Sequence, residues 1–290
     1  MAKSKNGGTR SYIRGRIGSD VYSVGKNGKG ERQQVVRSLA EVVSNPRTES
    51  QMYGRMIMST VMQAVSGLAT VIDHSFDGFP KGQPSISEFI KTNYALVKAD
   101  ALAHPATAFN FGIVNYQEKG ILPGAYVISK GSALVPAAVS AGFQKIEIAL
   151  TAGTLTVGGL KAALGLAEEG YLTLVTVDDT AGVQITRAHL DTTLADATAI
   201  TGANVESLFA IEGNSRVAIS LDTNTIKIEQ LFTMGNSWAY GLIVSDKIDG
   251  AWVHNNCTLS AEMAASAKSA NAALPTYPTG QQEFLNGGDL

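Results

Sequence analysis

The four histidines and the single cysteine are the side chains that could ligate a metal ion. The histidines occupy positions 74, 104, 189 and 254, and no two of them share a helical or strand spacing. His254 and Cys257 lie three residues apart and could form half of a zinc site. Structural zinc sites need four ligands, usually supplied as two such pairs, and the chain has no second pair. We therefore expect no metal, and we interpret His254 and Cys257 as part of a turn or strand edge.

Three short motifs bring glycine, serine or acidic residues together at spacings that enzymes use. Gly235-Asn236-Ser237-Trp238-Ala239 approaches a nucleophile elbow, but the closing glycine is missing. Gly153 to Gly159 has glycines at phosphate-loop spacing without the lysine and hydroxyl residue that complete such a loop, which favours a turn. Asp178-Asp179 is typical of a turn cap and has no third oxygen ligand for calcium. No nucleophile accompanies a base, so we expect no enzyme, no cofactor and no small-molecule substrate.

Length and composition indicate a globular chain whose charge is unevenly distributed. The 290 residues suffice for one large domain or two modest ones with a real core. Residues 1–60 hold eleven Lys or Arg and four Asp or Glu, giving +7, whereas the remainder holds twelve against twenty-one, giving −9. Opposite charge in the two parts favours head-to-tail contact between copies, with a solvated basic arm as the alternative.

The sequence also indicates the compartment. One cysteine excludes an internal disulfide framework and suits a protein made in a cytosol. The first residues are basic but no apolar stretch follows them, so we expect no ordinary secretory signal. The longest weakly apolar region, Ile148 to Ala167, is interrupted by Lys161, glycines and threonines and is too polar to span a bilayer. We expect a soluble protein with no membrane partner.

The N-terminal segment alternates in the manner of strands and is rich in basic residues. Over positions 13–17, Arg14 and Arg16 alternate with apolar or glycine positions, which predicts one basic and one apolar face. Asn27-Gly28 predicts the tight turn of a hairpin. A glycine-rich, two-stranded ribbon of this kind is marginally stable in water and needs something to lie on.

The arginines near this ribbon are the candidates for contact with a neighbouring subunit. We expect Arg14, Arg16, Arg37 and Arg47 to make such contacts, the alternative being solvation or ion pairs within the chain. The same positive charge, interleaved with tyrosines, could track the phosphates of packaged DNA. A pI near 6.1 and the lack of a nucleic-acid motif disfavour a dedicated DNA-binding protein.

Two helices are predicted next. The first opens either at Asn45, before a proline, or at a capping box over residues 48–51, and its apolar stripe runs to about residue 73. Met52 and Met56 lie on that stripe, and because methionine adapts to irregular partners they are candidates for an assembly seam, with ordinary core as the alternative. A second helix over residues 85–103 would complete an antiparallel helix pair.

Short strands separated by turn residues dominate the rest of the chain, which favours an antiparallel sandwich or barrel. The candidate strands are 126–129, 145–150, 171–177, 183–187, 216–221, 226–232, 238–244 and 252–259. Short inserted helices are predicted over 156–167 and 189–200, so the fold class is α+β. The predicted organisation is a basic β-hairpin arm (1–44), a helix pair (45–110), an antiparallel β-rich domain (111–262) and a C-terminal helix or tail (263–290).

Two groups of short motifs, one near each end of the chain, form a recognisable pattern. The N-terminal motifs are Arg14-Gly15-Arg16-Ile17-Gly18, Val21-Tyr22-Ser23, Val36-Arg37-Ser38 and Asn45-Pro46-Arg47-Thr48, followed by Gln51 and Arg55. The later ones are Lys130-Gly131-Ser132, Trp238-Ala239-Tyr240-Gly241, Ile243-Val244-Ser245, Asp249-Gly250-Ala251-Trp252 and Leu259. Together they resemble an uncharacterised family that is common in Bacteroidetes and in their crAss-like bacteriophages. After the second tryptophan the family often has Arg-Ser, where this chain has His254-Asn255-Asn256.

The resemblance implies a virion component, in particular a ring-forming protein of the neck or tail beside the portal, with no catalytic residues. The expected partners are copies of the chain in a ring and the adjoining portal, neck or tail proteins, with packaged DNA along the channel as a further possibility. The alternative is a β-sandwich binding module for a cell-surface carbohydrate or receptor, with Trp238 and Trp252 as stacking platforms. Exposed tryptophan rings would favour the binding module, and buried rings the structural protein.

Overall fold

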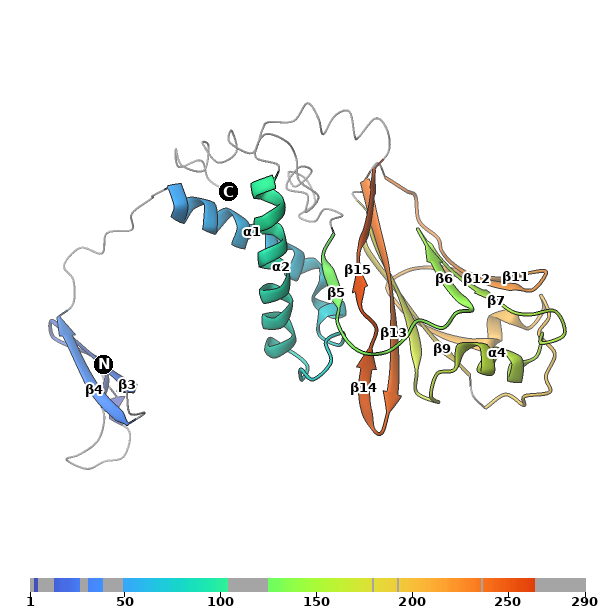
Figure 1. The fold of residues 1–290 in the computed structure, drawn as a ribbon, viewed down its shortest axis with the longest axis horizontal. Helices are drawn as coiled ribbons and strands as arrows, with labels where there is room; N and C mark the ends of the chain where they lie inside the picture. The colour runs from blue at the N-terminus through green and yellow to red at the C-terminus, as the bar shows by residue number, and fades with distance from the viewer. Residues whose placement is uncertain are drawn as a thin grey trace. The chain divides into compact units, whose positions relative to one another are not determined.

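The computed structural model describes residues 3–4, 13–26, 31–38, 49–103, 125–178, 180–191, 193–235 and 237–263. The chain divides into two compact units, Met1–Thr48 and Glu49–Leu290, and each is described by itself. Helices and mostly antiparallel sheets confirm the predicted α+β class (Figure 1). No helix among the described residues is both long and apolar enough to cross a membrane.

The N-terminal unit contains one antiparallel sheet. Its strands lie in chain order: β1 (Lys3–Ser4), β2 (Ile13–Ile17), β3 (Asp20–Lys26) and β4 (Arg32–Ser38). The predicted hairpin is the β3–β4 pair, whose turn lies outside the described residues. A second hairpin joins β2 to β3 through Gly18, whose φ of +60° is a left-handed conformation that glycine adopts without strain. The sheet is therefore wider than the two-stranded ribbon that the turn signal predicts.

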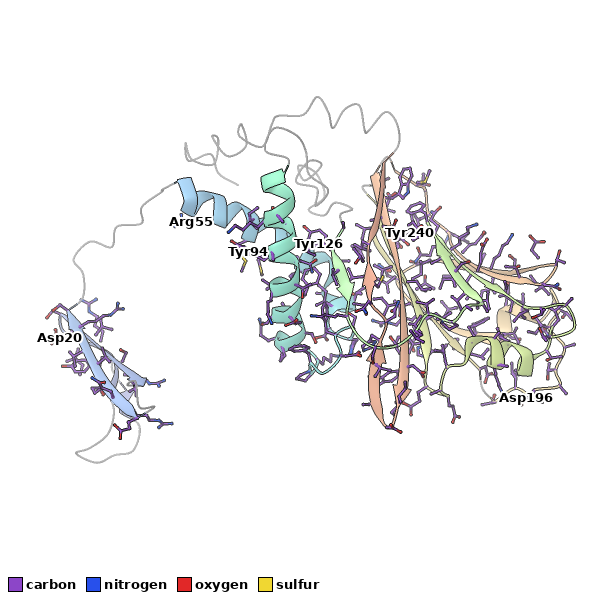
Figure 2. The ribbon with its side chains drawn as sticks, viewed as in Figure 1. Asp20, Arg55, Tyr94, Tyr126, Asp196 and Tyr240 are labelled. Atoms are coloured by element: carbon purple, nitrogen blue, oxygen red, sulfur yellow. The ribbon has the colours of Figure 1, made fainter. Side chains whose placement is uncertain are left out.

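Two long helices begin the C-terminal unit, α1 (Glu49–Ile72) and α2 (Gln83–Ala103). The predicted stripe of α1 is buried from Val61 onward, since Val61, Leu68 and Ile72 are at most 1% exposed. Phe89 of α2 joins the same core, where its ring stacks on Tyr126 at a centroid distance of 6.0 Å. Figure 2 shows the described side chains and labels Tyr126 among them. The helices thus contribute to one apolar core and are covered on that side.

The remaining strands form three sheets. The largest has the order β10-β9-β8-β13-β14, with β16 also paired to β13, and a second has the order β11-β12-β7-β6. A two-stranded sheet joins β15 to β5. The bounds are β5 Val127–Ser129, β6 Val139–Gly142, β7 Lys145–Ala149, β8 Tyr171–Asp178, β9 Gly182–Leu190, β10 Phe209–Gly213, β11 Val217–Asp222, β12 Thr225–Gln230, β13 Ser237–Ile248, β14 Ala251–His254, β15 Cys257–Thr258 and β16 Ser260–Met263.

The six-stranded sheet is covered on both faces. Leu172 and Leu174 of β8 belong to a core shared with the four-stranded sheet, whereas Val175 and Val177 belong to the core shared with α1 and α2. Because side chains alternate along a strand, a strand between two layers must be apolar on both faces. The C-terminal unit is therefore a sandwich-like arrangement with a helical layer on its outer side (Figure 1).

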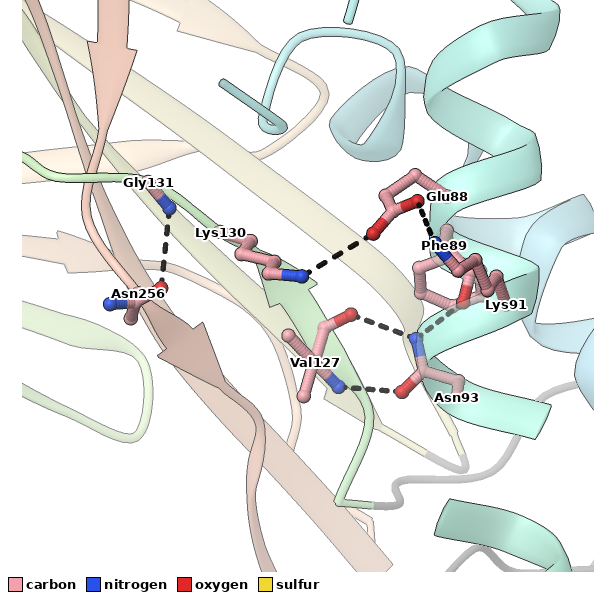
Figure 3. A network of polar contacts seen from close by, with 8 residues as sticks. All are labelled: Glu88, Phe89, Lys91, Asn93, Val127, Lys130, Gly131 and Asn256. Carbon is pink, nitrogen blue, oxygen red and sulfur yellow. Dashed lines mark hydrogen bonds and ion pairs between the residues drawn. The ribbon is translucent and has the colours of Figure 1, made fainter. Parts of the chain in front are cut away.

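A buried amide fastens α2 to the short strand β5. The side chain of Asn93 donates to the carbonyl of Val127 at 3.0 Å and accepts from its backbone N–H at 2.8 Å (Figure 3). Asn93 is fully buried, so it satisfies backbone groups that would otherwise lack partners. At the surface nearby, Lys130 pairs with Glu88 at 3.3 Å. These contacts hold the helical layer in a fixed register on the sheets.

The structure corrects two predicted elements. Residues 189–200 do not form a helix: β9 continues to Leu190, where it pairs with β10, and Asp191 then accepts a hydrogen bond from the backbone N–H of Thr193 in a turn. The inserted helices are α4 (Val157–Leu164), as predicted, and a 3-10 turn, η1 (Val205–Leu208). The single strand expected over 252–259 is divided between β14 and β15, because Asn255 folds inward and bonds the backbone of Val244 and Leu242.

Most of the other predicted strands are confirmed, and the sequence did not indicate β6, β10 or β16. The predicted C-terminal helix and tail lie outside the described residues, beyond the end of β16 at Met263.

Candidate functional site

Three of the predicted contact arginines share one face of the N-terminal sheet. Arg16 lies opposite Val21, and Val21 lies opposite Arg37, so two arginines flank one apolar residue in a row across the strands. Arg14 is two residues before Arg16, and strand alternation returns it to the same face. All three side chains are exposed, and Arg16 Nε donates to the carbonyl of Gly18 at 2.8 Å. We call this surface the basic face.

The opposite face of the same sheet carries the larger share of its apolar side chains, beside polar ones, and we call it the apolar face. Tyr22 lies opposite Val36, and in the neighbouring rows Ile17 lies opposite Asp20 and Val24 lies opposite Gln34. Ile17 is 50% exposed and Val36 is 51% exposed. None of the side chains described for residues 14–25 and 31–38 is buried. The N-terminal sheet therefore has hydrogen-bonded strands but no hydrophobic core of its own among the described residues.

The other predicted contact residues are only partly located. Arg47 lies outside the described residues. Met52 and Met56 lie in α1, but their side chains are outside the described set, so their role at an assembly seam stays a prediction. Met58 and Met62 of the same helix are 41% and 43% exposed, which leaves part of α1 apolar and open.

The two tryptophans differ in exposure. Trp238 is half-buried against Phe143, with 5.4 Å between ring centroids. Trp252 is 41% exposed. The centroid of its ring lies 5.5 Å from that of Tyr171, and the Tyr171 centroid lies 4.6 Å from that of His189. Exposed tryptophan rings were expected of a binding module and buried rings of a structural protein. Trp252 has the exposure expected of a binding platform, and Trp238 does not.

A cavity of about 400 Å³ adjoins Trp252. It lies between the loop that follows α1, residues 73–81, and the six-stranded sheet, which contributes the first residue of β8 and residues of β14. We call it the Trp252 cleft. Its lining includes Asp73, His74, Phe79, Lys81, Tyr171 and Trp252.

The loop side of the Trp252 cleft carries groups that donate and accept hydrogen bonds. Asp73 accepts from the backbone N–H of Gly82 and lies 3.7 Å from Lys81 Nζ and 3.9 Å from His74 Nε2. Partial burial lowers the pKa of His74, and the charge of Lys81 lowers it further. The imidazole is therefore favoured in its neutral form, in which one ring nitrogen donates and the other accepts.

The residues singled out for metal binding have structural roles. His254 is buried at the end of β14, where its Nδ1 lies 3.0 Å from Ser245 Oγ, and burial lowers its pKa. Cys257 is buried in β15, and burial raises its pKa to about 12. Within the described part of the chain, no three His, Cys, Asp or Glu side chains gather to hold a metal ion.

The glycine-rich and acidic motifs form turns, as the sequence analysis favoured. Gly153 has a φ of +92°, and Thr156 accepts the N–H of Gly159 at 3.1 Å as the cap of α4. Asp178 is buried and accepts backbone N–H groups from the next turn and from Gly235, at 2.7 to 2.8 Å. Asp179 and Asn236 lie outside the described residues.

Two surfaces of different chemistry therefore stand out: the basic and apolar faces of the N-terminal sheet, and the Trp252 cleft. The sequence indicated the arginines and Trp252, but not Tyr171, His189 or the loop of residues 73–81. Comparison with protein-family models, with curated proteins and with solved structures finds no match for this chain.

Proposed function

We propose that the chain is a non-enzymatic structural protein of a bacteriophage virion, which assembles into an oligomeric ring in the portal-proximal neck or tail. The C-terminal unit forms the body of each subunit, and the N-terminal sheet docks on a neighbouring copy. The motifs at both ends of the chain support the placement in a virion, through their resemblance to the family of crAss-like bacteriophages.

The observation that supports assembly is that none of the described side chains of the N-terminal sheet is buried. A small sheet is stable in water only when an apolar face is covered, and here Ile17 and Val36 are about half exposed. Its outer strand β4 also presents backbone groups that can pair with a strand of another chain. Docking on a neighbouring subunit would satisfy both requirements.

The uneven distribution of charge indicates which surfaces of neighbouring copies would meet. The excess of +7 over residues 1–60 includes the basic face, and the remaining residues carry −9. Arg14, Arg16 and Arg37 would approach the acidic body of the next copy, which produces head-to-tail contacts that close into a ring when the rotation permits. Packaged DNA along the channel is the other acidic surface that this face would suit.

The size of the full chain in solution tests the proposal. Sedimentation at low salt should show a closed oligomer whose population falls as salt rises, because ion pairs at an interface are screened. Arg16→Glu should weaken assembly, whereas Lys98→Glu, which reverses an exposed charge on α2, should not. A monomer at every concentration, with the N-terminal sheet folded on its own body, would overturn the proposal.

Proteomic analysis of purified virions tests the location separately. The chain should be present in stoichiometric, multiple copies and should remain after nuclease treatment and washing. Its absence from particles would eliminate the virion assignment.

The exposed ring of Trp252 favours a second candidate, a β-sandwich binding module for a cell-surface ligand. It needs no assembly and uses a different surface, so the two functions can be tested independently.

A further inference from the structure

We propose that the Trp252 cleft binds a neutral carbohydrate chain. This inference names the ligand of the second candidate function and does not depend on ring assembly. It rests on the aromatic stripe at the cleft, on the paired charges around it, and on the rigidity of the loop that forms one wall.

The aromatic stripe arises from the register of the six-stranded sheet. His189 lies opposite Tyr171, and Tyr171 lies opposite Ser245, so their side chains share one row on one face. Trp252 comes from β14, on the far side of β13, where it lies opposite Lys247, and its ring approaches the Tyr171 ring to 5.5 Å between centroids. The β8–β9 hairpin and the distant strand β14 therefore present adjoining rings.

The rings do not stack on one another face to face. The interplanar angle is 58° between Trp252 and Tyr171 and 39° between Tyr171 and His189. Tilted rings form a curved surface, and the 41% exposure of Trp252 leaves part of its ring open to a ligand. A sugar ring has an apolar face of C–H groups that can lie on such a ring, and aromatic rings with polar edges suit a ligand that is partly wet.

Two lysines beside the stripe are paired with carboxylates, and a histidine lies near a third carboxylate. Lys81 lies 3.7 Å from Asp73, and His189 lies 3.9 Å from Glu212. Lys247 forms an ion pair with Glu169 while its Nζ lies 6.0 Å from the centre of the Trp252 ring. These groups offer donors and acceptors to sugar hydroxyls.

The pairing of these charges separates carbohydrate from other ligands. A polyanion such as DNA is attracted by uncompensated positive charge, and the cations here already have carboxylate partners. A purely apolar ligand would remove water from the rim groups Asp73 and Lys81 without replacing its hydrogen bonds, which costs free energy. A neutral carbohydrate can pack its C–H faces on the aromatic rings and form hydrogen bonds with the charged groups at the rim through its hydroxyls.

The wall formed by residues 73–81 is held in place before any ligand arrives. Asp77 accepts the backbone N–H of His254 at 2.7 Å and that of Ser132 at 3.0 Å. Gly131 permits this approach, because a Cβ there would lie 2.2 Å from the His254 carbonyl. A preorganised wall reduces the entropy lost on binding.

Native gel electrophoresis of the full chain through immobilised neutral polysaccharides tests the proposal. The probes are a mannan, an amylose and a mixed-linkage β-glucan, each compared with a gel that lacks polysaccharide. At least one should retard the protein, and Trp252→Ala should weaken that retardation about tenfold, the size expected for a tryptophan at the centre of a contact. Trp252→Phe should give an intermediate effect. Leu134→Ala, which shortens an 86% exposed apolar side chain outside the cleft, should behave as wild type.

Two further measurements keep the result interpretable. Thermal unfolding should show that Trp252→Ala stays folded, as expected for a side chain exposed on a sheet edge. Arg16→Glu should leave polysaccharide retardation unchanged, and Trp252→Ala should leave oligomer size unchanged, so failure of one function is distinct from failure of the other. Lack of retardation on all three polysaccharides, equal retardation of Trp252→Ala and wild type, or retention only on DNA or heparin would overturn the proposal.

Discussion

The sheet of the N-terminal unit and the six-stranded sheet of the C-terminal unit are built from the same alternation but differ in what covers them. In the first, no described side chain is buried and Val36 is 51% exposed. In the second, the central strand β8 is buried on both faces, by another sheet on one side and by α1 and α2 on the other. Strand pairing therefore exists in both units, whereas a layered core exists in only one.

This difference separates the part of the chain that has a stabilising core from the part whose faces are open to a partner. Backbone pairing contributes little net free energy unless apolar faces are removed from water. The C-terminal unit can therefore fold by itself, and the N-terminal sheet can use its uncovered faces for a partner. Both tryptophans lie in the C-terminal unit, so their fluorescence reports the unfolding of that unit alone.

The largest expected effect is in the doubly covered sheet. Leu174→Ala should lower the free energy of unfolding by about 2–5 kcal/mol, because Leu174 is fully buried between the two sheets and the change leaves a cavity. Urea unfolding monitored by tryptophan fluorescence measures it. Alkylation of the buried thiol of Cys257, which should become faster as the unit opens, provides an independent check. A loss below about 0.5 kcal/mol, the size of a surface substitution, would contradict the layered core.

A smaller loss is expected where the helical layer is fastened to β5. Asn93→Leu should destabilise the C-terminal unit by about 1–3 kcal/mol, because it leaves the N–H and carbonyl of Val127 without their side-chain partner. The same urea titration measures the change. Lys91→Leu, an exposed position on the same helix, is the control and should be nearly neutral. Equal effects of the two substitutions would show that the buried amide does not hold the layer.

Acidity should weaken the C-terminal unit through its buried histidine. Burial lowers the folded-state pKa of His254 below its ordinary value of 6.5, so the unfolded state binds more protons when the pH falls below that value. The contribution of His254 to the free energy of unfolding should be at its maximum above about pH 6.5 and should decline as the pH falls toward 5. His254→Gln should make this decline shallower than in wild type when urea unfolding is repeated at several pH values. An unchanged slope would contradict the assignment to His254.

The smallest effect on stability is expected in the N-terminal sheet, where one substitution should affect assembly but not the folding of the C-terminal unit. Val36→Asp should change the tryptophan-monitored unfolding free energy by no more than about 0.5 kcal/mol, because Val36 is exposed and lies in the other unit. The same substitution should disrupt oligomer formation, as measured by sedimentation. A large loss of stability together with unchanged assembly would mean that the apolar face is covered within one chain.

Much of the secondary structure could be predicted from the sequence, because many elements have a clear period. Ile146 and Ile148 alternate with charged residues in β7 and are fully buried, and the stripe of α1 is buried from Val61 onward. The helix predicted over residues 189–200 was wrong because Leu and Ala there favour a helix locally, whereas pairing of β9 with β10 decides the start of the segment. That pairing is a tertiary effect that local propensity does not contain.

The candidate sites were predictable only in part, for a similar reason. The arginines of the basic face lie within one hairpin region, so a local register brings Arg16 and Arg37 together. The Trp252 cleft instead combines a loop after α1 with strands β8 and β14, which are brought close by the order of the sheet. Tyr171 gives no signal of its own in the sequence, since its position near Trp252 depends on the pairing of β13 with both β8 and β14.

The placement of β13 has a consequence for synthesis. This strand is in the interior of the six-stranded sheet, between β8 and β14, yet it is encoded at residues 237–248, near the end of the chain. While the nascent polypeptide emerges, β8 therefore lacks its inner neighbour until most of the message has been translated. An edge left open for so long invites pairing with other nascent chains. Faster translation up to residue 248, or a chaperone that shields β8, should then raise the yield of correctly folded subunits, and an mRNA that is truncated before residue 237 should yield insoluble protein.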